Sequence, residues 1–173
     1  MTAVRFVLRR WPLFALAISA AMLGVAHAFQ TFGGLAPCHL CLEQREVYWW
    51  AMAVAAVAVA AALVRRAAPI PRIASLVLAG IFAYGTYLAV FHAGAEWKFW
   101  SAPVTCSSTG PVTFAQLKAL LASGGGHQPA CDVAPWRLFG LSMAGWNAVA
   151  SAVLVLVSLA AAVLPGRRTE AAK

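Results

Sequence analysis

Two cysteines, Cys38 and Cys41, stand three positions apart between two long apolar segments, in the sequence Pro-Cys-His-Leu-Cys. At the start of a helix this spacing places the sulfurs one turn apart, close enough for an easily reduced disulfide or for a shared metal ion. The unpaired N–H groups and positive dipole of a helix N-terminus stabilise a thiolate. Arg45, four residues after Cys41, adds a positive charge on the same helix face. The motif therefore favours thiolate chemistry.

A structural zinc site is the alternative for this motif, with His39 or the later cysteines as additional ligands. His39 lies between the two cysteines, on a different part of the turn, and the sequence contains no second Cys-x-x-Cys motif. Both features favour redox chemistry over zinc binding.

The composition is that of a membrane protein. Of the 173 residues 62% are hydrophobic and only 10% are charged, and the mean hydropathy is +0.79. We therefore expect residues 1–173 to form a single integral membrane domain. The net charge of +8 does not indicate nucleic acid as a partner, because the basic residues cluster at the ends of apolar runs.

Four apolar runs are long enough to cross a bilayer as helices, at about residues 12–32, 41–64, 73–91 and 141–164. The short connection around Pro69 and Pro71 makes the second and third spans antiparallel neighbours. The predicted fold is an all-α bundle of four transmembrane helices. A cleaved signal peptide is the alternative for the first run, since Ala26-His27-Ala28 resembles a cleavage site, but the apolar character continues to Leu35.

The longest polar stretch is a loop at about residues 92–137, which carries the other two cysteines, Cys106 and Cys131. Within it, Thr113-Phe114-Ala115-Gln116 has the form of a capping box, and apolar residues recur at helical spacing until a run of three glycines. This pattern predicts a short amphipathic helix. It would lie on the membrane surface or cover the ends of the spans.

Basic residues are distributed unevenly between the two sides of the predicted bundle. Nine of the thirteen Lys and Arg residues lie at the N-terminus, at the turn from Arg65 to Arg72 and at the C-terminus. The positive-inside rule then places both termini in the cytoplasm and all four cysteines on the opposite side. That side of a bacterial inner membrane is oxidising, so two disulfides are expected. A purely structural loop disulfide is one alternative, and disulfide exchange between the two pairs is favoured.

With these features the chain resembles the DsbB family, membrane proteins that reoxidise the periplasmic thiol oxidase DsbA and pass electrons to quinone. The resemblance covers nearly the whole chain: four spans, a Pro-Cys-x-x-Cys motif followed by Arg45, and a pair of loop cysteines. Finer matches are Phe29-Gln30 before the motif and, after Cys131, the residues Trp136, Gly140-Leu141, Met143 and Trp146.

The resemblance implies a role for each cysteine. Cys106 would be attacked by the thiolate of a DsbA-like partner, and Cys131 would be its disulfide partner in the loop. Cys38 would exchange with the loop pair, and Cys41 would be the thiolate that meets the quinone. Arg45 would stabilise negative charge on the quinone oxygen and the thiolate.

The implied cofactor is ubiquinone or menaquinone, bound near the top of the bundle. The candidate lining residues are Gln30, His92, Trp136 and Met143, each of which could instead serve only packing or the membrane interface. The chain departs from the family pattern at His39, at Gln44, where an acidic residue is familiar, and in the glycine run before Cys131.

Two other functions fit parts of the sequence. A vitamin K epoxide reductase-like protein also joins quinone to a Cys-x-x-Cys motif, but there the motif lies late in the chain. A metal-binding or transport protein with a Cys/His site is the non-enzymatic alternative. All five acidic residues lie near span ends or in loops, which argues against a cation pathway.

Overall fold

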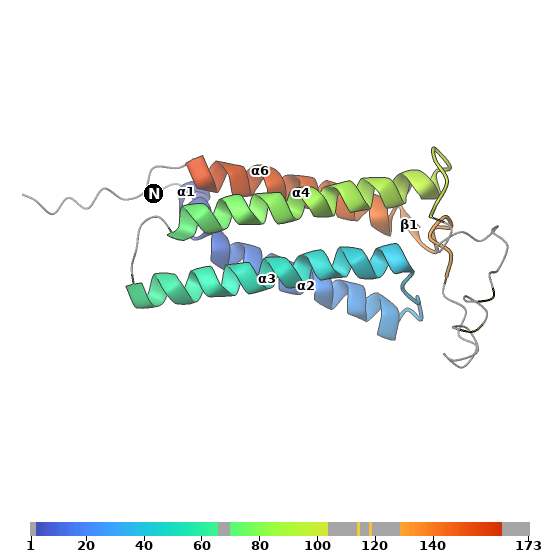
Figure 1. The fold of residues 1–173 in the computed structure, drawn as a ribbon, viewed down its shortest axis with the longest axis horizontal. Helices are drawn as coiled ribbons and strands as arrows, with labels where there is room; N and C mark the ends of the chain where they lie inside the picture. Colours follow the sequence, from blue (N-terminus) through green and yellow to red (C-terminus); the bar gives the residue numbers. More distant parts are fainter. Residues whose placement is uncertain (1–2, 66–69, 104–113, 115–117, 119–128, 164–173) are drawn as a thin grey trace, which may run out of the picture.

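A computed structural model describes residues 3–65, 70–103, 114, 118 and 129–163. Four long helices lie side by side along the long axis of the molecule (Figure 1). They are α2 (Trp11–Thr31), α3 (His39–Arg65), α4 (Ile70–Glu96) and α6 (Met143–Val163), with a short α1 (Ala3–Arg9) before them. All four long helices are long and apolar enough to cross a membrane. The predicted all-α fold with four spans is confirmed, and the chain is a multi-pass membrane protein.

The bundle is held by contacts of α4 with α6 and α3, and of α3 with α2. Apolar side chains fill its centre, among them Trp11, Leu78 and Phe82, each at most 1% exposed. The indole N–H of Trp11 donates to the Ser158 hydroxyl over 2.8 Å, so the one polar atom of this large side chain is satisfied. Large apolar side chains such as Val57 and Leu156 point outward, as the lipid-facing side of a membrane helix requires.

Helix α3 begins directly after Cys38. The Cys38 carbonyl accepts from the Leu42 N–H over 3.1 Å, and the Cys38 sulfur accepts from the Cys41 N–H over 3.3 Å. The sulfur therefore takes the place of the usual oxygen of a helix N-cap. Helix α2 ends at Thr31, and Gly34 (φ +65°) and Pro37 lie in the turn that leads from it to this cap. The local sequence thus fixes both cysteines at the helix start.

Helix α4 extends beyond the predicted end of the third span at Phe91 and continues to Glu96. The added turn carries His92 and Glu96, which are polar but point into the bundle, where they are 3% and 7% exposed. Trp100 closes over this turn: it stacks on Phe91 with ring centroids 5.9 Å apart, and its N–H donates to the Phe91 carbonyl over 2.8 Å. A Cβ at Gly94 would lie 2.0 Å from the Trp100 ring, so only glycine fits there.

A small hairpin precedes the last span. Strand β1 (Arg137–Leu138) pairs antiparallel with β2 (Leu141–Ser142), and both turn residues, Phe139 and Gly140, have positive φ. This is the turn geometry that suits a two-residue hairpin. The helix of the fourth span begins at Met143, two residues after its predicted start at about Leu141. The Ser142 hydroxyl caps it by accepting from the Gly145 N–H over 3.1 Å.

Two expectations lie outside the described residues. One is the amphipathic helix after Thr113, of which only Phe114 and Lys118 are described. The other is the position of Cys106.

Candidate functional site

Three of the four cysteines meet at one end of the bundle. The sulfurs of Cys38 and Cys41 are 3.0 Å apart, and both residues are free thiols. Cys131 packs with Cys38 and Leu40 in one buried cluster, in which Cys131 is 1% exposed. The structure therefore brings a cysteine of the long loop to the Cys-x-x-Cys motif, which sequence spacing alone could not establish.

The Cys38 thiol is tightly enclosed. Hydrogen bonds to the sulfurs of Cys131 and Cys41, together with burial, raise the pKa of Cys38 well above its usual range. When all three residues are reduced, Cys38 therefore keeps its proton and donates it to a neighbouring sulfur. A negative charge in this cluster is better placed on Cys41.

Arg45 lies one turn beyond Cys41 and is held by α2. Its Nη1 donates to the Gln30 side-chain carbonyl over 2.6 Å, and its Nη2 donates to the Ala26 backbone carbonyl over 3.1 Å. These two bonds keep the guanidinium beside the motif and leave its charge uncompensated by any acidic partner among the described residues. Gln30 thus contacts Arg45.

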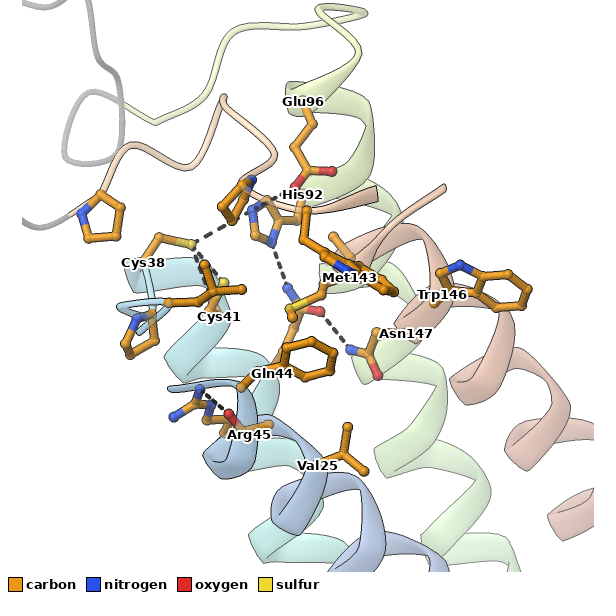
Figure 2. Close-up of a pocket in the computed structure, with 18 of the residues that line it drawn as sticks. Val25, Cys38, Cys41, Gln44, Arg45, His92, Glu96, Met143, Trp146 and Asn147 are labelled. Atoms are coloured by element: carbon orange, nitrogen blue, oxygen red, sulfur yellow. Dashed lines mark hydrogen bonds and ion pairs between the residues drawn. The ribbon is translucent and has the colours of Figure 1, made fainter. Parts of the chain in front are cut away.

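A largely apolar cavity of about 870 Å³ opens beside Cys41 (Figure 2). Residues of α2, α3, α4 and α6 and of the segment around the hairpin line it. Among the sequence-predicted residues, those in its wall are Cys38, Cys41, Arg45, His92, Trp136 and Met143. Trp136 also packs on Phe29, with ring centroids 5.4 Å apart. An apolar wall with a few convergent polar groups is typical of a site for a small, largely apolar molecule.

Three polar residues at this site were missed by the sequence analysis as functional candidates: Gln44, Glu96 and Asn147. Gln44 hydrogen-bonds His92 over 2.9 Å and Asn147 over 2.6 Å, and Glu96 lies 3.7 Å from the His92 ring. All three line the cavity. The available signal was their polarity within or at the end of apolar spans, where polar side chains usually face the protein interior.

The histidine beside the cysteines is His92, whereas His39 points away from them. His39 is exposed and lies 3.5 Å from Glu43 of its own helix. The zinc alternative that used His39 as a ligand is therefore wrong. The ligand atoms of Cys38, Cys41 and His92 lie within 4.8 Å of one another, so donor spacing by itself does not separate metal binding from redox chemistry.

Comparison with known proteins distinguishes redox chemistry from metal binding at this site. Residues 8–161 match the family model described as "Disulfide bond formation protein DsbB". A relative named "Disulfide bond formation protein B", from Methylococcus capsulatus, is 34% identical over 140 residues, which cover 73% of this chain and 77% of that protein. No solved structure matches the chain. The match favours DsbB over the vitamin K epoxide reductase-like and metal-binding alternatives. The chain belongs to the DsbB family, membrane thiol oxidoreductases of disulfide bond formation.

Proposed function

We propose that this protein reoxidises a DsbA-like periplasmic dithiol oxidase and passes the electrons to membrane quinone. The observation that carries the proposal is the position of the Cys-x-x-Cys motif between a cavity and the third cysteine. Cys38, Cys41 and Arg45 lie in the wall of the cavity, and Cys131 packs against Cys38. Family membership supports the thiol chemistry, and the size and apolar wall of the cavity support a quinone as the acceptor.

The first step is proposed to occur in the loop. The partner's thiolate attacks Cys106 of a Cys106–Cys131 disulfide, a mixed disulfide with Cys106 forms, and the electron pair of the broken bond leaves on Cys131. The second thiol of the partner then loses its proton and attacks the mixed disulfide, which releases the oxidised partner and a Cys106 thiolate.

The second step moves the electrons to the motif. The Cys131 thiolate attacks Cys38 of a Cys38–Cys41 disulfide, so that a Cys38–Cys131 bond forms and Cys41 leaves as a thiolate. The Cys106 thiolate then attacks Cys131, which restores the loop disulfide and frees Cys38. The packing of Cys131 against Cys38 supports this exchange, because an attacking sulfur must reach its target.

Cys41 would then face the acceptor. A quinone held in the cavity beside Cys41 and Arg45 would supply the acceptor for the two electrons and two protons of the Cys38 and Cys41 thiols. The Cys41 thiolate would donate the electrons, and Arg45 would stabilise the negative charge that develops beside it. Cys38 would close the disulfide with Cys41, from which it lies only 3.0 Å away.

The proposed location is a bacterial inner membrane, with both termini in the cytoplasm. The start of α3, which follows Cys38 and carries Cys41, and strand β1 lie at one end of the bundle, and α1 and the end of α3 lie at the other (Figure 1). We predict that a membrane-impermeant thiol reagent labels Phe139→Cys in intact spheroplasts, in a chain whose native cysteines are serines. Phe139 is 89% exposed in the hairpin turn. The matched variant Val4→Cys, in α1, should be labelled only after permeabilisation, and the reverse pattern would contradict the orientation.

The function itself is tested by turnover in detergent with a reduced DsbA-like partner and a soluble ubiquinone or menaquinone analogue. We expect partner oxidation that requires both this protein and the quinone, with one quinone reduced for each disulfide made. Omitting the quinone should stop the reaction after the protein's own disulfides are consumed. Continued oxidation of the partner without quinone, under anaerobic conditions, would contradict the proposal.

A further inference from the structure

A row of hydrogen bonds crosses the bundle and ends at the cysteine motif, and Figure 2 shows its part from Asn147 to the cysteines. It starts at Tyr48 of α3, whose hydroxyl lies 2.5 Å from Asn147 Oδ1 of α6. Asn147 Nδ2 donates to Gln44 Oε1 over 2.6 Å, which returns the row to α3. Gln44 Nε2 lies 2.9 Å from His92 Nδ1 of α4. The row therefore joins three helices through side chains alone.

The row continues from His92 into the cysteines. His92 Nε2 is 3.7 Å from the Cys38 sulfur, within the longer range of hydrogen bonds to sulfur. The Cys38 thiol in turn donates to the Cys41 sulfur over 3.0 Å. Neither the proposed exchange between the two cysteine pairs nor the position of Arg45 accounts for this row.

The direction of the row is set by Gln44. Its Nε2 also donates to the Leu40 backbone carbonyl over 3.2 Å, and a carbonyl oxygen can only accept. The nitrogen end of the amide therefore faces Leu40 and His92, and the oxygen end faces Asn147. Because the Gln44 oxygen faces Asn147, the group that donates to it must be the Asn147 amide nitrogen. The Asn147 oxygen then faces Tyr48 and accepts from its hydroxyl.

The same orientation fixes the proton on His92. Because Nδ1 accepts from Gln44, a neutral His92 carries its proton on Nε2, the nitrogen that faces Cys38. Each donor in the row then points the same way, from Tyr48 toward Cys41. Hydrogen bonds aligned in this manner polarise one another, and an alignment that ends on an anion stabilises it.

We infer that this row stabilises the Cys41 thiolate through Cys38, and that Gln44 is a positioning residue that sets its direction. The inference deepens the proposed function and rests on it, since it concerns the thiolate that would donate electrons to quinone. Among the described residues, the charged or titratable groups around Cys41 are Arg45 and Cys38 on or beside its own helix, His92 from α4, and Cys131 from the segment before β1. Arg45 supplies charge from one side, and the row supplies aligned donors from the other.

Burial makes the stabilisation of the Cys41 thiolate depend on these hydrogen bonds. Gln44, Tyr48 and His92 are each at most 7% exposed, so water does not replace a lost donor. A second hydrogen bond, between the hydroxyls of Tyr48 and Ser151 over 3.2 Å, anchors the starting point. Glu96 lies 3.7 Å from His92 Nε2, and the Cys131 backbone carbonyl is a second acceptor for the proton of the His92 ring.

The first test is made on the wild-type chain. With 15N-labelled histidine, and His92→Asn to assign the signal, the ring nitrogens of His92 should report the tautomer that carries its proton on Nε2. In Gln44→Glu the new carboxylate can only accept, so the proton should move to Nδ1. A proton on Nδ1 in the wild type would overturn the inference directly.

The second test measures the Cys41 thiolate. The fully reduced protein is treated with iodoacetamide across a pH series, and mass spectrometry reads the alkylation of each cysteine. Gln44→Met keeps the side-chain size, adds no charge and removes the donor to His92, so Cys41 should react about tenfold more slowly near neutral pH. Its pH profile should move to higher pH. Tyr48→Phe, which removes only the first donor, should show a smaller shift in the same direction.

Two exposed positions provide matched controls. Tyr84→Phe removes a phenol from the lipid-facing side of α4, and Glu43→Gln alters a charge on an exposed face of α3. Both should keep the wild-type alkylation profile. If Gln44→Met does not fold, Tyr48→Phe decides: an unchanged Cys41 profile there overturns the inference. Quinone reduction by the same wild-type sample separates the proposed function from the inference about the row. No quinone reduction by the wild type would count against the proposed function. An active wild type together with unchanged Cys41 alkylation in the variants would count against the row alone.

Discussion

Cys106→Ser is expected to abolish oxidation of the DsbA-like partner, because this sulfur is the proposed point of attack for the partner's thiolate. The inner pair should be unaffected, since Cys38 and Cys41 lie 3.0 Å apart on their own helix start. The variant should therefore still form the Cys38–Cys41 disulfide when quinone is added. Partner oxidation is followed by thiol titration, and the inner disulfide by mass spectrometry of the same sample.

The matched variant for this prediction is Cys41→Ser, which removes the other end of the relay. It should retain one exchange of the loop disulfide with the partner and then stop. Turnover of the partner at the wild-type rate by Cys106→Ser would contradict the order of the relay.

Arg45→Met is expected to lower the rate of quinone reduction by about a hundredfold or more at saturating reduced partner. Electron transfer builds negative charge beside the thiolate in a cavity with a largely apolar wall, where a fixed cation is worth more than in water. Arg45→Lys keeps the charge but cannot make both bonds of the planar guanidinium, to Gln30 and to the Ala26 carbonyl. Its rate of quinone reduction should therefore fall between those of the wild type and Arg45→Met.

The alternative role for Arg45 is that of an anchor at the membrane interface. The two roles differ in what they change: an anchor affects the stability of the bundle, and a charge-stabilising group affects the rate of the chemical step. Arg72→Met, at the opposite end of the bundle, serves as the control for loss of an interfacial arginine. Unchanged quinone reduction and quinone affinity in Arg45→Met would leave only the anchor.

The sequence predicted the four spans well because apolar length is a direct requirement of the bilayer. Its bounds were least accurate at the span ends nearest the site. His92 and Glu96 continue α4 although they are polar, because their side chains turn into the bundle. Leu141 is apolar, but it pairs in the hairpin and precedes the helix. Hydropathy measures the affinity of a side chain for lipid and carries no information on whether neighbouring helices supply polar partners.

At the candidate site, too, the sequence predicted some relations between residues and not others. Cys38, Cys41 and Arg45 could be related to one another from sequence because they share one helix and their spacing fixes their geometry. The approach of Cys131 to Cys38, and the bonds from Gln44 to His92 and Asn147, join segments far apart in the chain. Such contacts depend on how the helices pack. Gln44 was recognised only as a departure from the family pattern, and its partners give that departure a physical meaning.

The central claim, that Cys38 and Cys41 pass electrons to quinone, is tested most directly without any partner protein. The fully reduced chain, purified in detergent, is titrated anaerobically with a soluble quinone analogue, while quinone absorbance and free thiols are followed together. The same titration is made on Cys106→Ser/Cys131→Ser, which cannot pass the disulfide on to the loop. There the first equivalent of quinone should be reduced as two thiols disappear, and mass spectrometry should find a Cys38–Cys41 disulfide. Quinone left unreduced in that variant, or Cys38 and Cys41 still reduced after its addition, would contradict the claim.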